Sequence, residues 1–184
     1  MRTLGAVAFL LATAFCVPHA IGQQAVPILD PNACAFPDAS LVEATDLLEA
    51  PAGTHGRVFS AKDGHFYFQD GVRARFFGTN TGGAGCCPDK AAAEMVAERL
   101  SRYGINLLRL HSIDGSYTRF IDYAAGTTQT LNPDMLDRYD YFVAQLLKRG
   151  IYVYFDLLDY RQFLPGDGVR DAGQLQVCWE SSIK

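Results

Sequence analysis

Hydrophobic and polar residues first follow a strand-like pattern near residue 65. The runs 65–69 and 72–77 are rich in aromatic and β-branched residues, and they flank Asp70 and Gly71. An Asp-Gly pair between two such runs is typical of a hairpin turn. The pattern predicts a β-hairpin that leads into a strand ending near Asn80.

Two later segments have helical spacing. Pro88 and Asp89 open the first segment and Gly104 ends it, whereas Asn132 caps the second and Gly150 ends it. We expect each helix to pack one apolar stripe against a sheet. The stripe residues are Ala92, Met95, Val96, Leu100 and Tyr103 in the first helix, and Met135, Leu136, Tyr139, Phe142, Val143, Leu146 and Leu147 in the second.

An apolar run follows each predicted helix, at residues 105–111 and 151–157. Such runs are typical of parallel strands that are covered on both faces. Right-handed crossovers make these strands parallel neighbours. The order strand, helix, strand, helix, strand predicts an α/β fold, which is either an open doubly wound sheet or the start of a (β/α)8 TIM barrel.

The composition excludes several classes of partner. The chain of 184 residues is 49% hydrophobic and has a net charge of −4, with no run of Lys or Arg that would neutralise a phosphate backbone. We therefore expect no nucleic-acid partner. The glycines of residues 78–85 do not have the G-x-G-x-x-G spacing, so we expect no dinucleotide or other cofactor, and a flavodoxin-like protein is disfavoured.

The first residues predict a signal peptide. Arg2 precedes an apolar run from Leu4 to Val17 that is too short to span a bilayer. We place the signal peptide at residues 1–22, with cleavage before Gln23, or alternatively after Ala20. The mature chain is then secreted or periplasmic and no longer attached to a membrane, whereas an uncleaved anchor is the alternative.

The remaining cysteines predict one or two disulfides. Cys34, Cys86, Cys87 and Cys178 are an even number in a chain bound for an oxidising compartment, and their pairing stays open. Adjacent cysteines such as Cys86 and Cys87 rarely bridge each other. We expect no metal site, because no His lies near these cysteines at zinc-ligand spacing. The proline-rich residues 23–63 are expected to form an irregular leader.

Polar side chains gather at the predicted carboxyl ends of the strands, where parallel sheets bind ligands. Asn80 closes the first strand, Arg109 and His111 close the second, and Asp156 and Asp159 follow the third. Arg109 and His111 are two residues apart and so point to the same side. The alternatives are that Arg109 pairs with a buried carboxylate, that His111 is a core residue, and that the two aspartates only solvate a loop.

Aromatic residues add a second signal for sugar binding, because sugars stack on flat apolar rings. Most of the aromatic residues are expected to pack in the core or the hairpin. Tyr117 and Tyr160 are the two that we expect near a site, since both follow predicted strand ends.

Two stretches, Asp70–Asn80 and Gly104–His111, resemble the cellulase-like glycoside hydrolases of family 5, as do Leu131–Arg138. The resemblance runs from about Gly64 to Gly168, and it implies that residues 64–170 are the amino-terminal part of the barrel. It implies a retaining O-glycosyl hydrolase with a (β/α)8 barrel, a hairpin before the first barrel strand, and a carbohydrate substrate. It also implies sugar-binding roles for Asn80, Arg109 and His111. One difference is that related chains carry a His after the third strand, where this chain has Leu158 and Asp159.

The resemblance also implies that the chain holds only the amino-terminal part of such an enzyme. Retaining hydrolysis needs two carboxyl groups about 5 Å apart, and neither family glutamate can be assigned, because Glu180 follows Trp179 rather than Asn. We expect residues 171–184 to be a divergent tail and the chain alone to be inactive. Whether Lys184 is a genuine terminus, the result of a frameshift or the end of a partial record stays open. A non-catalytic secreted domain that binds carbohydrate or protein is the alternative.

Overall fold

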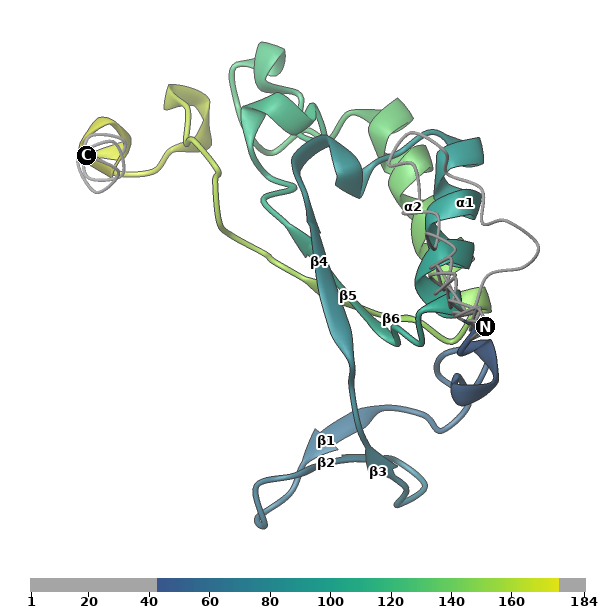
Figure 1. Cartoon of the computed structure of the whole chain (residues 1–184). Coiled ribbons are helices and arrows are strands. Elements are labelled where there is room, and N and C mark those ends of the chain that lie inside the picture. Colours follow the sequence, from purple (N-terminus) through teal and green to yellow (C-terminus); the bar gives the residue numbers. More distant parts are fainter. Residues whose placement is uncertain (1–42, 176–184) are drawn as a thin grey trace, which may run out of the picture. The chain divides into compact units, whose positions relative to one another are not determined.

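The computed structural model describes residues 43–175, which hold two sheets and two α-helices (Figure 1). The predicted signal peptide, the first part of the predicted leader, Cys34, Cys178 and residues 176–184 lie outside the described residues. The short 3₁₀ helices are η1 (Thr45–Leu47), η2 (Gly83–Cys86), η3 (Ser116–Thr118), η4 (Tyr123–Ala125) and η5 (Pro165–Asp167).

A small antiparallel sheet precedes the α/β part. It comprises β1 (Val58–Ser60), β2 (Phe66–Phe68) and β3 (Arg73–Ala74) in that order. The predicted hairpin is confirmed as β2 and β3, with Phe68 N donating to the carbonyl oxygen of Val72 at 2.8 Å. Strand β1 was not expected, because it lies in the segment that we predicted to be irregular. Its three residues carry too short a pattern to be recognised without their partner β2.

The second sheet is parallel, as predicted. Its strands are β4 (Gly78–Gly82), β5 (Leu107–His111) and β6 (Tyr152–Phe155), in that order. Together with the two α-helices that connect them, these strands form two consecutive β-α-β units. The described residues form no closed barrel, since β4 and β6 are the outer strands of this sheet.

Helices α1 (Lys90–Arg102) and α2 (Pro133–Lys148) lie on one face of the parallel sheet (Figure 1). Asn132 caps α2 by accepting from the backbone N–H groups of Asp134 and Met135, as predicted. For α1 the prediction was displaced: Asp89 is the N-cap, accepting from Ala92 N at 2.8 Å, and Pro88 lies before the helix. An Asp carboxylate at the N-cap satisfies an otherwise unpaired backbone donor, which favours this start.

The core lies between the helices and the parallel sheet. Its largest fully buried side chains include Phe142 and Leu146 of α2, Leu108 and Leu110 of β5, and Ile151. These residues form one cluster with buried positions of α1 and of the connection after β5.

The buried face of α1 agrees only in part with the predicted stripe, of which Val96 and Leu100 pack against the core. Ala93, Ala97 and Ser101 are buried, whereas Met95 and Tyr103 are 39% and 36% exposed. Small side chains at four-residue steps let a helix approach its packing partners closely, because packing distance follows the size of the contact residues. The larger side chains therefore lie at the border of the contact.

Only one face of the parallel sheet is covered by described residues. Leu108 and Leu110 point toward the helices, with Val153 and Phe155 of β6 beside them. Arg109 and Tyr154 alternate with these residues and so project from the opposite face. We predicted that these strands are covered on both faces. Among the described residues, only the face toward the helices is covered.

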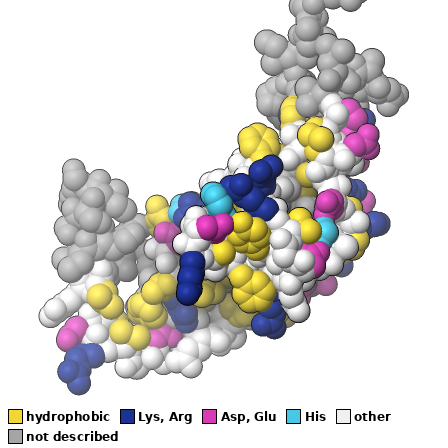
Figure 2. Space-filling view, turned by 90° about the horizontal axis from the view of Figure 1, so that it is seen from below, with side chains coloured by type: hydrophobic (Ala, Val, Ile, Leu, Met, Phe, Trp, Pro, Cys, Tyr) yellow, Lys and Arg dark blue, Asp and Glu magenta, His cyan; other side chains and the backbone are white. Residues whose placement is uncertain are grey.

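Figure 2 shows hydrophobic side chains at the surface among charged ones. Four exposed hydrophobic side chains belong to the small antiparallel sheet and its turn, namely Val58, Phe59, Phe66 and Val72. In residues 43–175 no helix has the length and apolar character needed to cross a bilayer.

Candidate functional site

Three residues on neighbouring strands form one row on the uncovered face of the parallel sheet. The register places Asn80 of β4 beside Arg109 of β5, and Arg109 beside Tyr154 of β6. The next row toward the carboxyl ends contains Gly82 and His111, with Asp156 directly after β6. Because residues two apart on a strand share a face, both rows project from the same face.

Asp156 joins the predicted site residues of β5. Its Oδ2 atom lies 2.7 Å from Nη2 of Arg109 and 2.8 Å from Nδ1 of His111, and its Oδ1 lies 3.2 Å from Nε of Arg109. The Asp156 side chain is 10% exposed, whereas Arg109 and His111 are 43% and 31% exposed. A recessed carboxylate therefore holds two more accessible nitrogen donors in place.

The charges at this site reinforce one another. The hydrogen bond from Arg109, and then that from His111, lowers the pKa of Asp156 below its ordinary value. The same hydrogen bond raises the pKa of Arg109. Asp156 is thus held ionised and Arg109 protonated. Arg109 does pair with a carboxylate, as in the alternative, but Asp156 is only partly buried and the pair leaves the guanidinium accessible.

Asp159 contacts the same histidine. Its Oδ2 lies 2.7 Å from Nδ1 of His111 and accepts a hydrogen bond from Ser112 Oγ at 3.1 Å. Nδ1 of His111 therefore faces two carboxylates. The structure brings both aspartates into the candidate site, rather than leaving them as loop residues.

Three of these side chains can hold a metal ion. His111, Asp156 and Asp159 each offer one ligand atom, and these atoms lie within 4.8 Å of one another. All three, however, are already engaged in the hydrogen bonds described above. Protein donors such as Arg109 thus satisfy the carboxylates without a cation.

A cavity of about 460 Å³ opens beside Arg109. Its lining includes Tyr154, Asp156, Leu158 and Asp159. It places apolar side chains next to the charged cluster, a combination typical of small-molecule sites.

Asn80 has a less direct place than predicted. Strand β4 continues to Gly82, so Asn80 lies in the middle of the strand and not at its end. Its side chain is exposed and makes no hydrogen bond with another described residue. The glycine-rich stretch after Asn80 supplies the last residues of β4 and then η2.

Asp114 anchors the loop that carries Asp159. Its side chain, in a residue only 5% exposed, accepts hydrogen bonds from the backbone N–H groups of Asp159 and Tyr160, both at 2.8 Å. The hydroxyl of Tyr123 donates to the carbonyl oxygen of Asp114 and accepts from Gln162 N. Sequence reasoning missed both anchors, because nothing local marks a partner 45 residues away.

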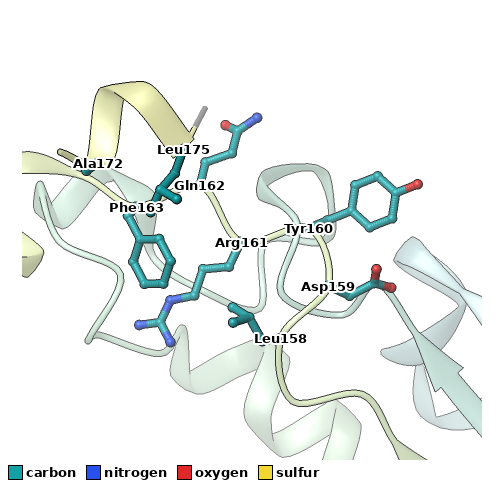
Figure 3. Close-up of a pocket in the computed structure, with 8 residues that line it drawn as sticks. All are labelled: Leu158, Asp159, Tyr160, Arg161, Gln162, Phe163, Ala172 and Leu175. Atoms are coloured by element: carbon teal, nitrogen blue, oxygen red, sulfur yellow. The ribbon is translucent and has the colours of Figure 1, made fainter. Parts of the chain in front are cut away.

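The two tyrosines that we expected near a site do lie beside it. The Tyr160 ring packs edge-on against His111, with centroids 6.0 Å apart, and edge-on against Tyr117 at 6.2 Å. Figure 3 shows the side chains of Tyr160 and Asp159 directed away from those of Arg161 and Phe163, although all four residues line one pocket. The Tyr117 side chain remains largely exposed.

A second anchor fixes the far part of the same loop. Arg161 donates from Nε to Thr128 Oγ1 and from Nη2 to Thr128 O, both at 2.7 Å. Asp167 accepts from the backbone N–H groups of Thr128 and Leu164 and from Thr127 Oγ1. Burial raises the pKa of Asp167, but these hydrogen bonds outweigh it, so the pKa lies below its ordinary value. The loops after β5 and β6 are therefore joined at two places.

Cys86 and Cys87 lie behind the site as free, buried thiols. Cys86 Sγ is 3.5 Å from the carbonyl oxygen of His111. Burial raises the pKa of Cys86 to about 12 and that of Cys87 to about 11. The expected disulfides are therefore not formed by these two residues, whose surroundings are those of a packed core.

No family model matches the chain, and no curated protein matches it in sequence. Among solved structures, it is similar to a glycoside hydrolase of family 5 from Bacteroides vulgatus, with 17% sequence identity and a TM-score of 0.44 over 59% of this chain and 25% of that one. Another glycoside hydrolase structure has 18% identity and a TM-score of 0.44 over 59% of this chain and 26% of the other. The chain thus spans about a quarter of the length of these structures.

Proposed function

We propose that this chain is the amino-terminal part of a secreted or periplasmic O-glycosyl hydrolase with a (β/α)8 barrel, and that its site binds a sugar of a polysaccharide or oligosaccharide. The observation that carries the proposal is the orientation of Arg109 and His111 by Asp156 at the carboxyl ends of parallel strands. This edge of the sheet is where such folds bind their ligands. The sequence motifs around Asn80 and Arg109 support the same family.

The cluster suits the hydroxyl groups of a sugar. The Arg109 guanidinium offers several N–H donors, and the ring of His111 offers its second nitrogen, since Nδ1 faces the carboxylates. The Asn80 amide, beside Arg109 in register, adds a donor and an acceptor. Charge-assisted hydrogen bonds are the stronger ones, so Arg109 should contribute most to affinity.

Asp156 has an orienting role in this proposal. Arg109 and His111 keep its carboxyl ionised, so it has no proton to give to a leaving group at neutral pH. Retaining hydrolysis requires one protonated and one ionised carboxyl group about 5 Å apart. We therefore assign substrate binding, and no general acid, to this cluster.

A binding titration tests the proposal. The full chain is titrated by calorimetry with soluble cello-, manno- and xylo-oligosaccharides, and reducing ends are measured in parallel. We expect binding to at least one series, and a loss of about tenfold or more for Arg109→Ala, the equivalent of one charge-assisted hydrogen bond. Binding without turnover supports the carbohydrate-binding role alone. If none of the three series binds, the proposed substrate class is wrong.

The matched control is Arg99→Ala on helix α1, which removes an arginine away from the cluster. It should bind like the unsubstituted chain. Secretion is tested separately, by expressing residues 1–184 in a bacterial host and determining the amino terminus of the exported product. A terminus at Gln23, or at Ile21 for cleavage after Ala20, supports the predicted signal peptide.

A further inference from the structure

The Tyr117 ring lies beside two glycines although it is at the surface. Tyr117 is 55% exposed and lies in the short helix η3, which follows β5. Exposed tyrosines normally sample several rotamers, because no neighbours restrict them. Here two glycines leave just enough space for the ring.

Gly83 and Gly115 contact opposite edges of this ring. A Cβ atom at Gly115 would lie 2.6 Å from Cε1 of Tyr117, and one at Gly83 would lie 3.0 Å from Cε2. The first distance is shorter than real Cβ contacts, and the second is tighter than most of them. A side chain at either position would therefore displace the ring, so the ring occupies space that the two glycines leave open.

Tyr160 forms the second wall beside it. The two rings meet at 77° with centroids 6.2 Å apart, so they form a corner. Asp114 fixes the backbone N–H of Tyr160, and the Tyr160 ring in turn packs edge-on against His111 at 6.0 Å. The corner thus continues directly from the polar cluster.

We propose that Tyr117 and Tyr160 form an aromatic subsite that stacks on a second pyranose ring of a glycan whose first ring occupies the Arg109–His111 cluster. This inference rests on the proposed function. A pyranose with equatorial hydroxyl groups presents flat C–H faces, which pack on aromatic rings while the hydroxyl groups remain hydrated. The preferred ligand is therefore an oligosaccharide of two or more equatorially substituted units.

The dependence of affinity on ligand length tests the subsite. Mono-, di- and tetrasaccharides of the series that binds best are titrated into the full chain and into Tyr117→Ala. We expect the unsubstituted chain to bind the longer ligands about tenfold more tightly than the monosaccharide. Tyr117→Ala should lose that gain and keep its affinity for the monosaccharide.

Two further variants separate the ring from its position. Tyr117→Phe keeps the ring and should keep most of the gain in affinity. Gly115→Ala keeps the tyrosine but displaces the ring, and should lose the gain as Tyr117→Ala does. Gly173→Ala is the matched control, since nothing lies within 4 Å of a Cβ there. Thermal melting of each variant shows that the fold is retained.

The outcomes distinguish the two proposals. Equal loss of affinity at all ligand lengths in Tyr117→Ala, or no loss at all, overturns the subsite while Arg109→Ala still tests the cluster. If the unsubstituted chain binds none of the oligosaccharides, both proposals fail. If longer oligosaccharides still bind more tightly than the monosaccharide in both Tyr117→Ala and Gly115→Ala, the second sugar binds elsewhere and the inference is overturned.

Discussion

Nδ1 of His111 lies 2.8 Å from Oδ2 of Asp156, across two neighbouring parallel strands. The same oxygen accepts from Arg109 at 2.7 Å. One carboxylate therefore orients two side chains that come from one strand. Because both donors depend on it, Asp156 is the residue whose change should disturb the candidate site most widely.

We expect Asp156→Asn to weaken oligosaccharide binding by about tenfold, as Arg109 and His111 lose their ionised partner. The amide has nearly the same shape as the carboxylate, so the loss reflects charge and orientation. Calorimetry with the oligosaccharide that binds best measures it. The matched control is Asp137→Asn. It neutralises an exposed carboxylate of α2 that pairs with Lys90 of α1. Unchanged affinity in Asp156→Asn would show that the carboxylate does not orient the donors.

A second prediction concerns His55, whose ring contacts the carboxylates of Asp70 and Glu49. The hydrogen bond with Asp70, and then that with Glu49, raises the pKa of His55 above 6.5. A raised pKa means that the interaction stabilises the fold below about pH 6.5 and is lost as the pH rises through the folded-state value. The melting temperature should therefore fall between about pH 6 and pH 9.

Replacing the imidazole should remove this pH dependence. His55→Gln is expected to melt lower at pH 6 and to show a flatter profile up to pH 9. His65→Gln, an exposed histidine beside Arg73, serves as the control and should keep the profile of the unsubstituted chain. An unaltered slope in His55→Gln would assign the pH dependence to another group.

The elements predicted correctly from sequence have strong local signals. Asn132 before a proline marks the start of α2, and Asp70-Gly71 marks the turn between β2 and β3, because the residues that fix the backbone are adjacent in sequence. The parallel order of β4, β5 and β6 follows from the alternation of strands and helices. These features need no knowledge of distant contacts.

The missed features depend on distant partners. Asp114 becomes an anchor only because residues 159 and 160 return to it, and no periodicity marks such a contact. The buried face of α1 was predicted only in part, because hydrophobicity favoured Met95, whereas close packing buries the small residues Ala93 and Ala97. Asn80 was placed at a strand end because the length of β4 is set by its pairing with β5. The sequence thus predicted Arg109 and His111 as neighbours, but not how the loops around them are joined.

A third prediction concerns thiol reactivity. Burial raises the pKa of Cys86 to about 12 and that of Cys87 to about 11, so at about pH 8 well under 1% of either is thiolate. We expect neither to react with iodoacetamide in the native chain on the timescale that labels both completely in urea. Peptide mass spectrometry resolves the two from the other cysteines. Rapid labelling of the native chain would show that the segment from Gly83 to Cys87 opens readily.

The last prediction tests the contact between residue 49 and the start of β6. Gly150 has a φ of +81°, and a Cβ there would lie 2.6 Å from the carbonyl oxygen of Glu49. Gly64 has nearly the same φ, +80°, but nothing lies within 4 Å of a Cβ. Both alanine variants carry the cost of a left-handed backbone, about 1 kcal/mol, and only Gly150→Ala adds a clash with backbone.

Gly150→Ala should therefore lower the free energy of unfolding by about 1–3 kcal/mol more than Gly64→Ala, the range for forced overpacking. Urea unfolding of the two variants and the unsubstituted chain measures the difference directly. Glu49 also contacts His55. A large difference would therefore mean that residues 49–55 are fixed against the end of α2, and that the contact between His55 and Glu49 forms with the fold. Equal losses would mean that Glu49 moves aside without cost, and the pH dependence expected from His55 should then be small as well.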